Sequence, residues 1–158
     1  YLVEIGDFSP ETAAGYASMF YIGVTLGRFI NGFLAMRLGD KTLIRMGTSI
    51  IAVGIALMLV QFHYVLALVG FIVIGLGCAP IYPCIIHMTP DVFGKDKSQA
   101  MIGVQMAFAY VGILAMPPLF GIVAENISIS LLPIFLLAFI AIMFAMHELT
   151  LKSAAKNK

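Results

Sequence analysis

Residues 65–86 read VLALVGFIVIGLGCAPIYPCII, a run that contains no charged side chain. A helix that crosses the hydrocarbon core of a bilayer needs about 20 consecutive, mostly apolar residues. Strands of a membrane barrel would instead read as short segments in which apolar and polar residues alternate. The run therefore predicts a transmembrane helix, and it decides the fold class.

Four further apolar runs flank this one along the chain. Together they predict five spans, at residues 12–38, 41–62, 64–89, 98–124 and 129–146. Before the first span, Ser9 and Pro10 provide a capping hydroxyl and a proline at the first helical position. No domain-sized linker separates the runs. We therefore expect an all-α fold, in which residues 1–158 form one polytopic membrane helix bundle without a soluble domain.

The composition indicates that lipid is the main solvent of the chain. Hydrophobic residues make up 61% and charged residues only 11%, whereas a globular domain usually carries about 25% charged residues. The net charge of +1, without a dense basic cluster, excludes a nucleic-acid binder. Cys78 and Cys84 lie in one apolar run and are expected to be free structural thiols. The three histidines lie on different segments, so we expect no metal site.

The basic residues predict the orientation of the chain in the membrane. The joints at 61–64 and 125–128, and the segment before Pro10, contain no lysine or arginine. We therefore expect a multi-pass protein of the cell membrane with its amino end outside and its carboxy end in the cytoplasm. The chain begins without methionine, and YLVE at 1–4 resembles the end of a preceding span, so a fragment is expected. The basic residues of the other joints and the tail are Arg37, Lys41, Arg45, Lys95, Lys97, Lys152, Lys156 and Lys158.

The joint after the first span reads GFLAMRLGDK, residues 32–41. Its pattern resembles the G-x-L-A-D-R-x-G-R-[RK] signature of the major facilitator superfamily, which recurs in a weaker form between helices eight and nine. Met36 replaces the signature aspartate, and Asp40 replaces the first basic residue after the second glycine. The aspartate's role is therefore not carried over. The matching positions are Gly32, Leu34, Ala35, Arg37, Gly39 and Lys41.

Two interpretations of this motif are open. Gly32 would permit close helix approach, and Gly39 would end the helix in a left-handed turn. Arg37 and Lys41, near a helix carboxy end, could then clamp neighbouring helices as a cytoplasmic gate. Alternatively, the two basic residues simply anchor the chain at the cytoplasmic surface.

The third span contains Gly75, Gly77, Pro80 and Pro83 within GLGCAPIYPCIIHMTP, residues 75–90. Proline removes a backbone donor, and lipid does not tolerate the freed carbonyls unless they face protein or a watery cavity. The pattern predicts a helix break at a solute site, bent between Gly75 and Pro83, with Cys78, Pro80 or Tyr82 nearer the bundle axis than the lipid. A packing kink is the alternative. Pro117 and Pro118 form a similar pair of prolines within the fourth span.

Three stretches resemble the fucose–galactose–proton symporter family within the superfamily. They are GRFINGFLAMRLGDK (27–41), GLGCAPIYPCIIHMTPDVFGKDKSQAM (75–101) and GVQMAFAYVGILAMPPLFG (103–121). The resemblance implies helices eight to twelve of a twelve-helix transporter, with the end of helix seven, and a monosaccharide as the solute. It also implies that a coupling proton or sodium ion is bound by the missing amino-terminal half, and no other cofactor is expected.

Arg28 is the only basic residue that does not belong to the joints or the tail, and it lies inside the first span. At about 100° per residue, Ser18, Tyr21, Thr25 and Arg28 fall within about 80° on one helix face, with Asn31 beside them. A charge at this depth is costly unless it is paired or hydrated, so the stripe should face the bundle interior. The partner of Arg28 could be a backbone carbonyl, water, a solute oxygen or a group in the missing half.

Gln105 and Tyr110 are the other polar candidates, on the fourth span. They lie about 140° apart on its helical wheel, so they cannot both face one narrow cavity. Each could line a solute path or form a hydrogen bond between helices.

The sequence thus predicts secondary active transport of a small polar solute by alternating access. An enzyme would need a nucleophile, metal cluster or acid–base pair in the spans, and no such catalytic residue is present in the sequence of the spans. A channel subunit or a structural membrane bundle without transport of its own is the alternative.

Overall fold

The computed structural model describes residues 2–3, 8–60 and 64–156, and its long elements are all helices. No strand occurs in these ranges, which confirms the all-α prediction. The cap of the first helix is also confirmed, because the Ser9 hydroxyl accepts a hydrogen bond from the Thr12 backbone at 3.3 Å. The elements are α2 (Pro10–Ala17), α3 (Met19–Leu34), α4 (Asp40–Leu59), α5 (Tyr64–Phe93), α6 (Lys95–Asn126), the 3-10 helix η1 (Ile129–Leu131) and α7 (Leu132–Lys156).

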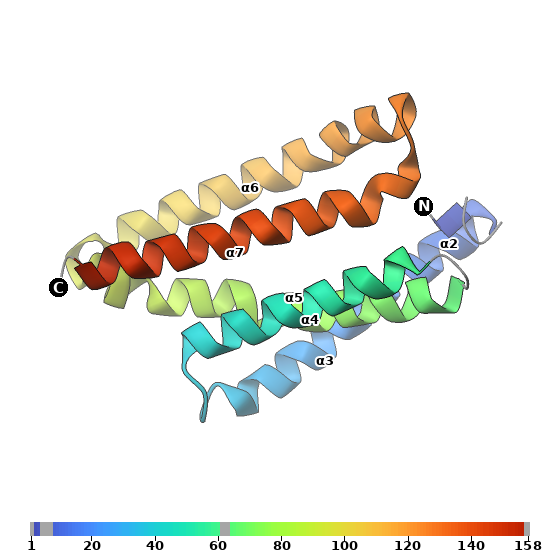
Figure 1. Ribbon diagram of the computed structural model, residues 1–158. Helices are drawn as coiled ribbons and strands as arrows, with labels where there is room; N and C mark the ends of the chain where they lie inside the picture. Colours follow the sequence, from blue (N-terminus) through green and yellow to red (C-terminus); the bar gives the residue numbers. More distant parts are fainter. Residues whose placement is uncertain (1, 4–7, 61–63, 157–158) are drawn as a thin grey trace.

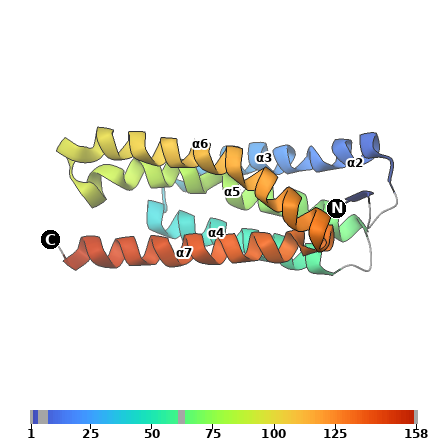
Figure 2. The ribbon, with the colours of Figure 1, turned by 90° about the horizontal axis from the view of Figure 1, so that it is seen from above.

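The helices lie along a common direction in two layers (Figures 1 and 2). In Figure 2, α3 and α5 lie on one side of the bundle and α4 and α7 on the other, while α6 runs obliquely from beside α5 to the start of α7. Helix α5 is central, since it contacts α3, α4, α6 and α7. The main core lies between α4 and α5 and includes Ile51, Ile55, Met58, Ile74 and Ile81.

Glycines hold α5 close to both α3 and α4. A β-carbon on Gly77 would lie 2.6 Å from the carbonyl oxygen of Gly47, and one on Gly47 would lie 2.6 Å from that of Gly77. On the other side, a β-carbon on Gly27 would lie 2.7 Å from the Leu76 carbonyl oxygen. Small residues at such contacts let helix backbones approach closely, which is how membrane helices gain packing energy. The three helices therefore form one tightly packed unit.

Helix α5 runs without interruption through Pro80 and Pro83, so the predicted break is not a gap in the helix, and the bend between Gly75 and Pro83 stays a prediction. Each proline removes one backbone bond, while the turns on either side keep theirs. Gly75 and Gly77 are buried contact points within this helix and do not end it. Pro117 and Pro118 likewise lie inside the continuous helix α6.

Several helix ends differ from the predicted spans. The first span is divided by a turn at Ser18 into α2 and α3, which follow one line through the bundle (Figure 2). Helices α5 and α7 run past Thr89 and Met146 into charged sequence, because hydropathy marks the membrane segment and not the helix end. Only Gly94 separates α5 from α6, at a φ of 88° that glycine adopts without steric cost.

Four helical segments are long and apolar enough to cross a membrane: Asp40–Leu59, Tyr64–Phe93, Lys95–Asn126 and Ile129–Lys156. With α2 and α3 in line, this agrees with the predicted polytopic membrane bundle. The apolar window of α6 has no buried residue, and large side chains such as Phe108 and Leu114 are exposed. Such a surface suits lipid or further protein, and not water.

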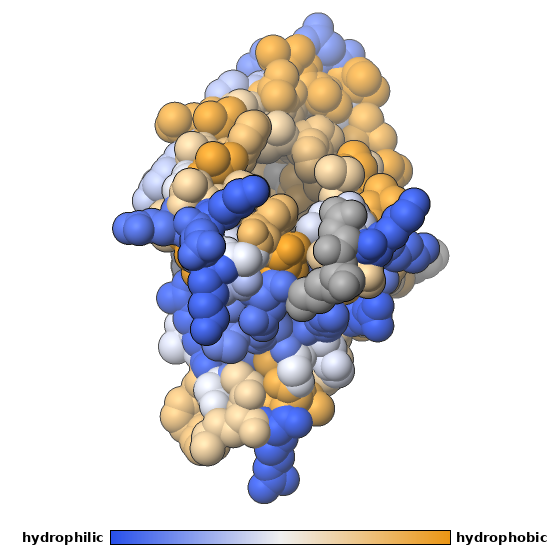
Figure 3. Space-filling model, turned by 90° about the vertical axis from the view of Figure 1, so that its left-hand side faces the viewer, coloured by the Kyte–Doolittle hydropathy of each residue, from blue (hydrophilic) through white to orange (hydrophobic). Residues whose placement is uncertain are grey.

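Hydrophilic side chains gather at one end of the bundle, which faces the viewer in Figure 3. This end contains the turn from α3 to α4, the turn at Gly94 and the last residues of α7. We call it the basic end, because the lysines and arginines of the predicted cytoplasmic joints belong to these segments. Lys158 and the joint residues 61–63 lie outside the described residues. The orientation of the basic end across a membrane stays a prediction.

Candidate functional site: a polar hollow between α3 and α5

A hollow of about 420 Å³ opens between α3 and α5. Three of the residues that the sequence predicts to line a cavity, Thr25, Arg28 and Tyr82, line this hollow together. We call it the α3–α5 hollow. Its other lining residues are Phe20, Tyr21, Val24, Cys78, Ala79 and Pro83.

The glycine contacts explain why these side chains meet. Gly23 packs against the backbone of Ile72, and Gly27 packs against that of Leu76, one turn further along α5. The residues of α3 that lie beside these two glycines therefore face residues of α5 that lie about one turn beyond Ile72 and Leu76. Cys78 lies near the middle of the 30-residue helix α5, so the hollow lies at mid-depth of the bundle.

Arg28 dominates the electrostatics of the α3–α5 hollow. It is exposed, and it forms no ion pair or hydrogen bond with any residue that the structure describes. The Thr25 hydroxyl donates to the Tyr21 carbonyl at 2.8 Å, which leaves its oxygen lone pairs free to accept. Tyr21 and Tyr82 expose 69% and 48% of their surface, so both rings are accessible from the hollow.

Asn31 does not belong to this group, although the helical wheel places it beside Arg28. It lines a separate, smaller hollow against Leu43, Gly47 and Pro80. Its side-chain oxygen is buried without a hydrogen-bond partner among the described residues. The helical wheel gives only the direction in which the Asn31 side chain leaves α3, and α4 lines the hollow on that side.

Gln105 and Tyr110 also lie away from the hollow and from each other. The Thr89 hydroxyl lies 3.2 Å from the Gln105 side-chain oxygen, so Gln105 joins α6 to α5. Tyr110 is 67% exposed. Gln105 also lines a separate hollow of about 250 Å³ with Met143 and His147, so its surroundings fit both interpretations.

The predicted helix-break residues are divided between contact and lining roles. Pro83 lines the α3–α5 hollow, whereas Pro80 borders the hollow that contains Asn31. Pro117 and Pro118 are exposed on α6. Only Pro83 thus reaches the candidate site.

The geometry of the signature motif differs from the prediction at three residues. Gly39 is extended, with a φ of −74°, and caps the start of α4, so it does not form a left-handed turn. The chain leaves α3 through a right-handed turn at Ala35, which makes a left-handed residue unnecessary. Lys41 lies in the first turn of α4 and not near a helix carboxy end. No atom lies within 4 Å of a β-carbon built on Gly32, so it mediates no close approach here.

The basic residues of the signature motif do not join one helix to another in the described part of the chain. Neither Arg37 nor Lys41 forms an ion pair with a described residue. Instead, Asp40, which stands at a basic position of the signature, accepts from the His87 ring at 2.6 Å. The contact joins α4 to α5 across 47 residues of sequence, a pairing that no local pattern could have revealed.

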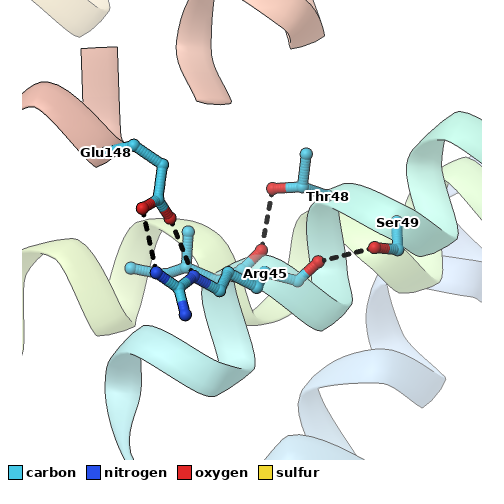
Figure 4. Close-up of polar contacts among 5 residues, drawn as sticks. Arg45, Thr48, Ser49 and Glu148 are labelled. Carbon is cyan, nitrogen blue, oxygen red and sulfur yellow. Dashed lines mark hydrogen bonds and ion pairs between the residues drawn. The ribbon is translucent and has the colours of Figure 1, made fainter. Parts of the chain in front are cut away.

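A second contact at the basic end joins α4 to α7 (Figure 4). The Arg45 guanidinium donates two hydrogen bonds to the Glu148 carboxylate, at 2.7 and 2.9 Å. This forked geometry is the strongest form of an arginine–carboxylate pair. The sequence had marked Arg45 only as part of the positive-inside bias.

Groups of three or more residues able to hold a metal ion are absent from the described part of the chain. The hollow contains hydroxyl, phenol and guanidinium groups and no paired carboxylates. Its described lining offers hydrogen-bonding groups that suit an oxygen-rich solute and includes no acid–base pair of the kind that hydrolysis needs.

Comparison with known proteins agrees with this architecture. The chain is 28% identical over 137 residues to an uncharacterised MFS-type transporter of Yersinia pestis, covering 82% of this chain and 34% of that protein. It is 24% identical over 139 residues to the membrane protein MosC of Rhizobium meliloti, covering 87% and 34%. The chain thus spans about a third of the length of these relatives. No solved structure matches it significantly.

The family model described as Major Facilitator Superfamily matches residues 2–157, nearly the whole chain. The family match and the bundle of long apolar helices both indicate a membrane transporter. The chain belongs to the Major Facilitator Superfamily, a family of membrane transporters and not of enzymes.

Proposed function

We propose that the protein containing this chain is a secondary active transporter of a small polar solute, and that the α3–α5 hollow is part of its solute site. The observation that carries this proposal is the convergence of Thr25, Arg28 and Tyr82 on one hollow at mid-depth. Hydrophobic helices rarely bring a charge and two hydroxyl-bearing side chains together in the membrane unless they serve a function.

The chain would supply helices eight to twelve, with the end of helix seven, of a twelve-helix transporter. A missing amino-terminal half would cover the exposed faces of α3 and α6 and complete the site. The coverage of about a third of each relative supports a longer parent protein. In this arrangement the amino end of the chain lies outside and the basic end lies in the cytoplasm.

Alternating access would then move the packed helices as a body. Because α5 is continuous and locked to α3 and α4 by Gly77, Gly47 and Gly27, bending within this unit would break close contacts. Rocking of the whole unit against the missing half would preserve them and expose the hollow to each side in turn. The ion contacts at the basic end, Asp40–His87 and Arg45–Glu148, would support the unit's cytoplasmic edge.

The resemblance to the fucose–galactose–proton symporter family supports a monosaccharide as the solute and a proton or sodium ion as the coupling ion. The acidic residues of the described chain lie toward helix ends, namely Glu11, Asp40, Asp91, Asp96, Glu125 and Glu148. A mid-membrane carboxylate for coupling would therefore come from the missing half.

Uptake by the full-length parent protein tests this function. Vesicles that contain it should accumulate labelled monosaccharide against its gradient, and a proton ionophore or removal of sodium should abolish the accumulation. Equal uptake by empty vesicles would contradict transport. Passive equilibration without ion dependence would favour a channel.

A further inference from the structure

We propose that the transported solute carries a single carboxylate, as a sugar acid does, and that Arg28 binds this group. This inference rests on the proposed function and narrows its substrate class from monosaccharides to their acids. It starts from the charge of the α3–α5 hollow. Among the described residues that line the hollow, Arg28 is the only charged one.

The carboxylates of the described residues do not neutralise this charge. Two of them are engaged at the basic end, where Asp40 contacts His87 and Glu148 binds Arg45. No ion pair joins Arg28 to any described acid. The hollow therefore contains a guanidinium group whose charge no described residue compensates.

An unpaired guanidinium at this depth calls for an anionic partner. Placing an uncompensated arginine at the middle of a membrane helix costs free energy. A carboxylate that accepts two parallel hydrogen bonds from the guanidinium fork offsets this cost and fixes the direction of the ligand. A neutral sugar hydroxyl would accept only one bond and would leave the charge uncompensated.

The other residues that line the hollow can contact the sugar ring and the hydroxyl groups of a sugar acid. The Thr25 oxygen can accept from a ring hydroxyl, because its own proton is donated to the Tyr21 carbonyl. The rings of Tyr21 and Tyr82 offer apolar faces for the C–H side of a pyranose and phenol groups for its hydroxyls. The hollow thus combines one anion-binding group with several neutral ones.

The count of charges distinguishes a carboxylate from a phosphate ester. A phosphate monoester carries about −1.5 to −2 charges at pH 7. One guanidinium balances one carboxylate, and the described lining offers no second cation for a dianion. A monocarboxylate is therefore the matched ligand.

The test compares pairs of solutes that differ only in oxidation at C6, namely glucuronate with glucose and galacturonate with galactose. Initial uptake rates are measured in proteoliposomes that contain the full-length transporter. We expect each acid to be taken up at least about tenfold faster than its neutral partner. In Arg28→Gln this preference should fall to within about threefold, and Arg28→Lys should retain part of it. Ser49→Ala, which lies on α4 outside the hollow, should leave the preference unchanged.

The outcomes separate the inference from the function on which it rests. Uptake of the neutral sugars at equal or higher rates would overturn the inference and leave monosaccharide transport standing. An unchanged acid preference in Arg28→Gln would overturn the role of Arg28. Uptake of none of the four solutes would contradict both the monosaccharide function and the inference. Equal amounts of each variant in the membrane show that a loss is not one of insertion, since removing this charge makes insertion easier.

Discussion

At the residue scale, two arginines of the chain differ in whether their guanidinium group has a partner. Arg45 lies at the basic end, where Glu148 accepts both of its forked hydrogen bonds. Arg28 lies at mid-depth with no partner among the described residues. The paired arginine is explained by structure alone, whereas the unpaired one needs a ligand or another part of the protein. The lack of a partner marks the candidate site only together with depth, because Arg37 is also unpaired among the described residues but lies at the basic end.

The Arg45–Glu148 pair predicts a charge-swap rescue. Arg45→Glu alone should lower the melting temperature of the purified transporter slightly, because two carboxylates would then face each other between α4 and α7. Adding Glu148→Arg should restore most of the loss, since the forked contact can form in reverse. Thermal unfolding in detergent measures both variants. A double variant no more stable than Arg45→Glu would show that the pair does not hold α4 to α7.

At the element scale, the packing of α5 depends on the absence of β-carbons. Gly77 and Gly47 face each other's carbonyl oxygens, and neither backbone can move without displacing a helix. The exposed glycines differ, because nothing lies within 4 Å of a β-carbon built on Gly15. The two classes of glycine look alike in sequence.

Gly77→Ala should therefore destabilise the bundle. Its β-carbon would lie 2.6 Å from the Gly47 carbonyl oxygen, and overpacking of this kind typically costs about 1–3 kcal/mol. Gly15→Ala in helix α2 is the matched control, and it should be neutral or slightly stabilising because alanine favours the helix by about 1 kcal/mol. The free energy of unfolding, or the melting temperature in detergent, distinguishes them. Equal effects of the two substitutions would contradict the packing of α4 against α5.

The sequence was sufficient for four of the five spans, but not for the division of the first span or for the contacts between helices. Hydropathy located the membrane segments, and the Ser9–Pro10 cap is present as predicted. The turn at Ser18 and the extended Gly39 were not predicted, because neighbouring helices and connection geometry set them.

The residues of the candidate site could likewise be predicted from the sequence only in part. One face of α3 could be predicted from its period, which placed Thr25 and Arg28 together. That Tyr82 of α5 would join them, and that Asn31 would not, depends on how glycines place the helices against each other.

At the scale of the whole molecule, the helices of this chain leave a large apolar surface uncovered. Helix α6 has no buried residue, whereas α5 is packed on several sides. With a chain about a third as long as its relatives, such asymmetry fits a bundle that is completed by further helices. The central claim is that the α3–α5 hollow becomes the solute site of that complete transporter, reached alternately from each side of the membrane.

The most direct measurement of this claim is the alkylation of Thr25→Cys by a membrane-impermeant maleimide, in the full-length protein with its native cysteines replaced. The account predicts reaction in both right-side-out and inside-out vesicles, slowed in both by the transported solute. Thr48→Cys on α4, where the native side chain is only 8% exposed, should stay unreactive. Reaction from one side only, or rates that the transported solute does not change, would contradict an alternating solute site between α3 and α5.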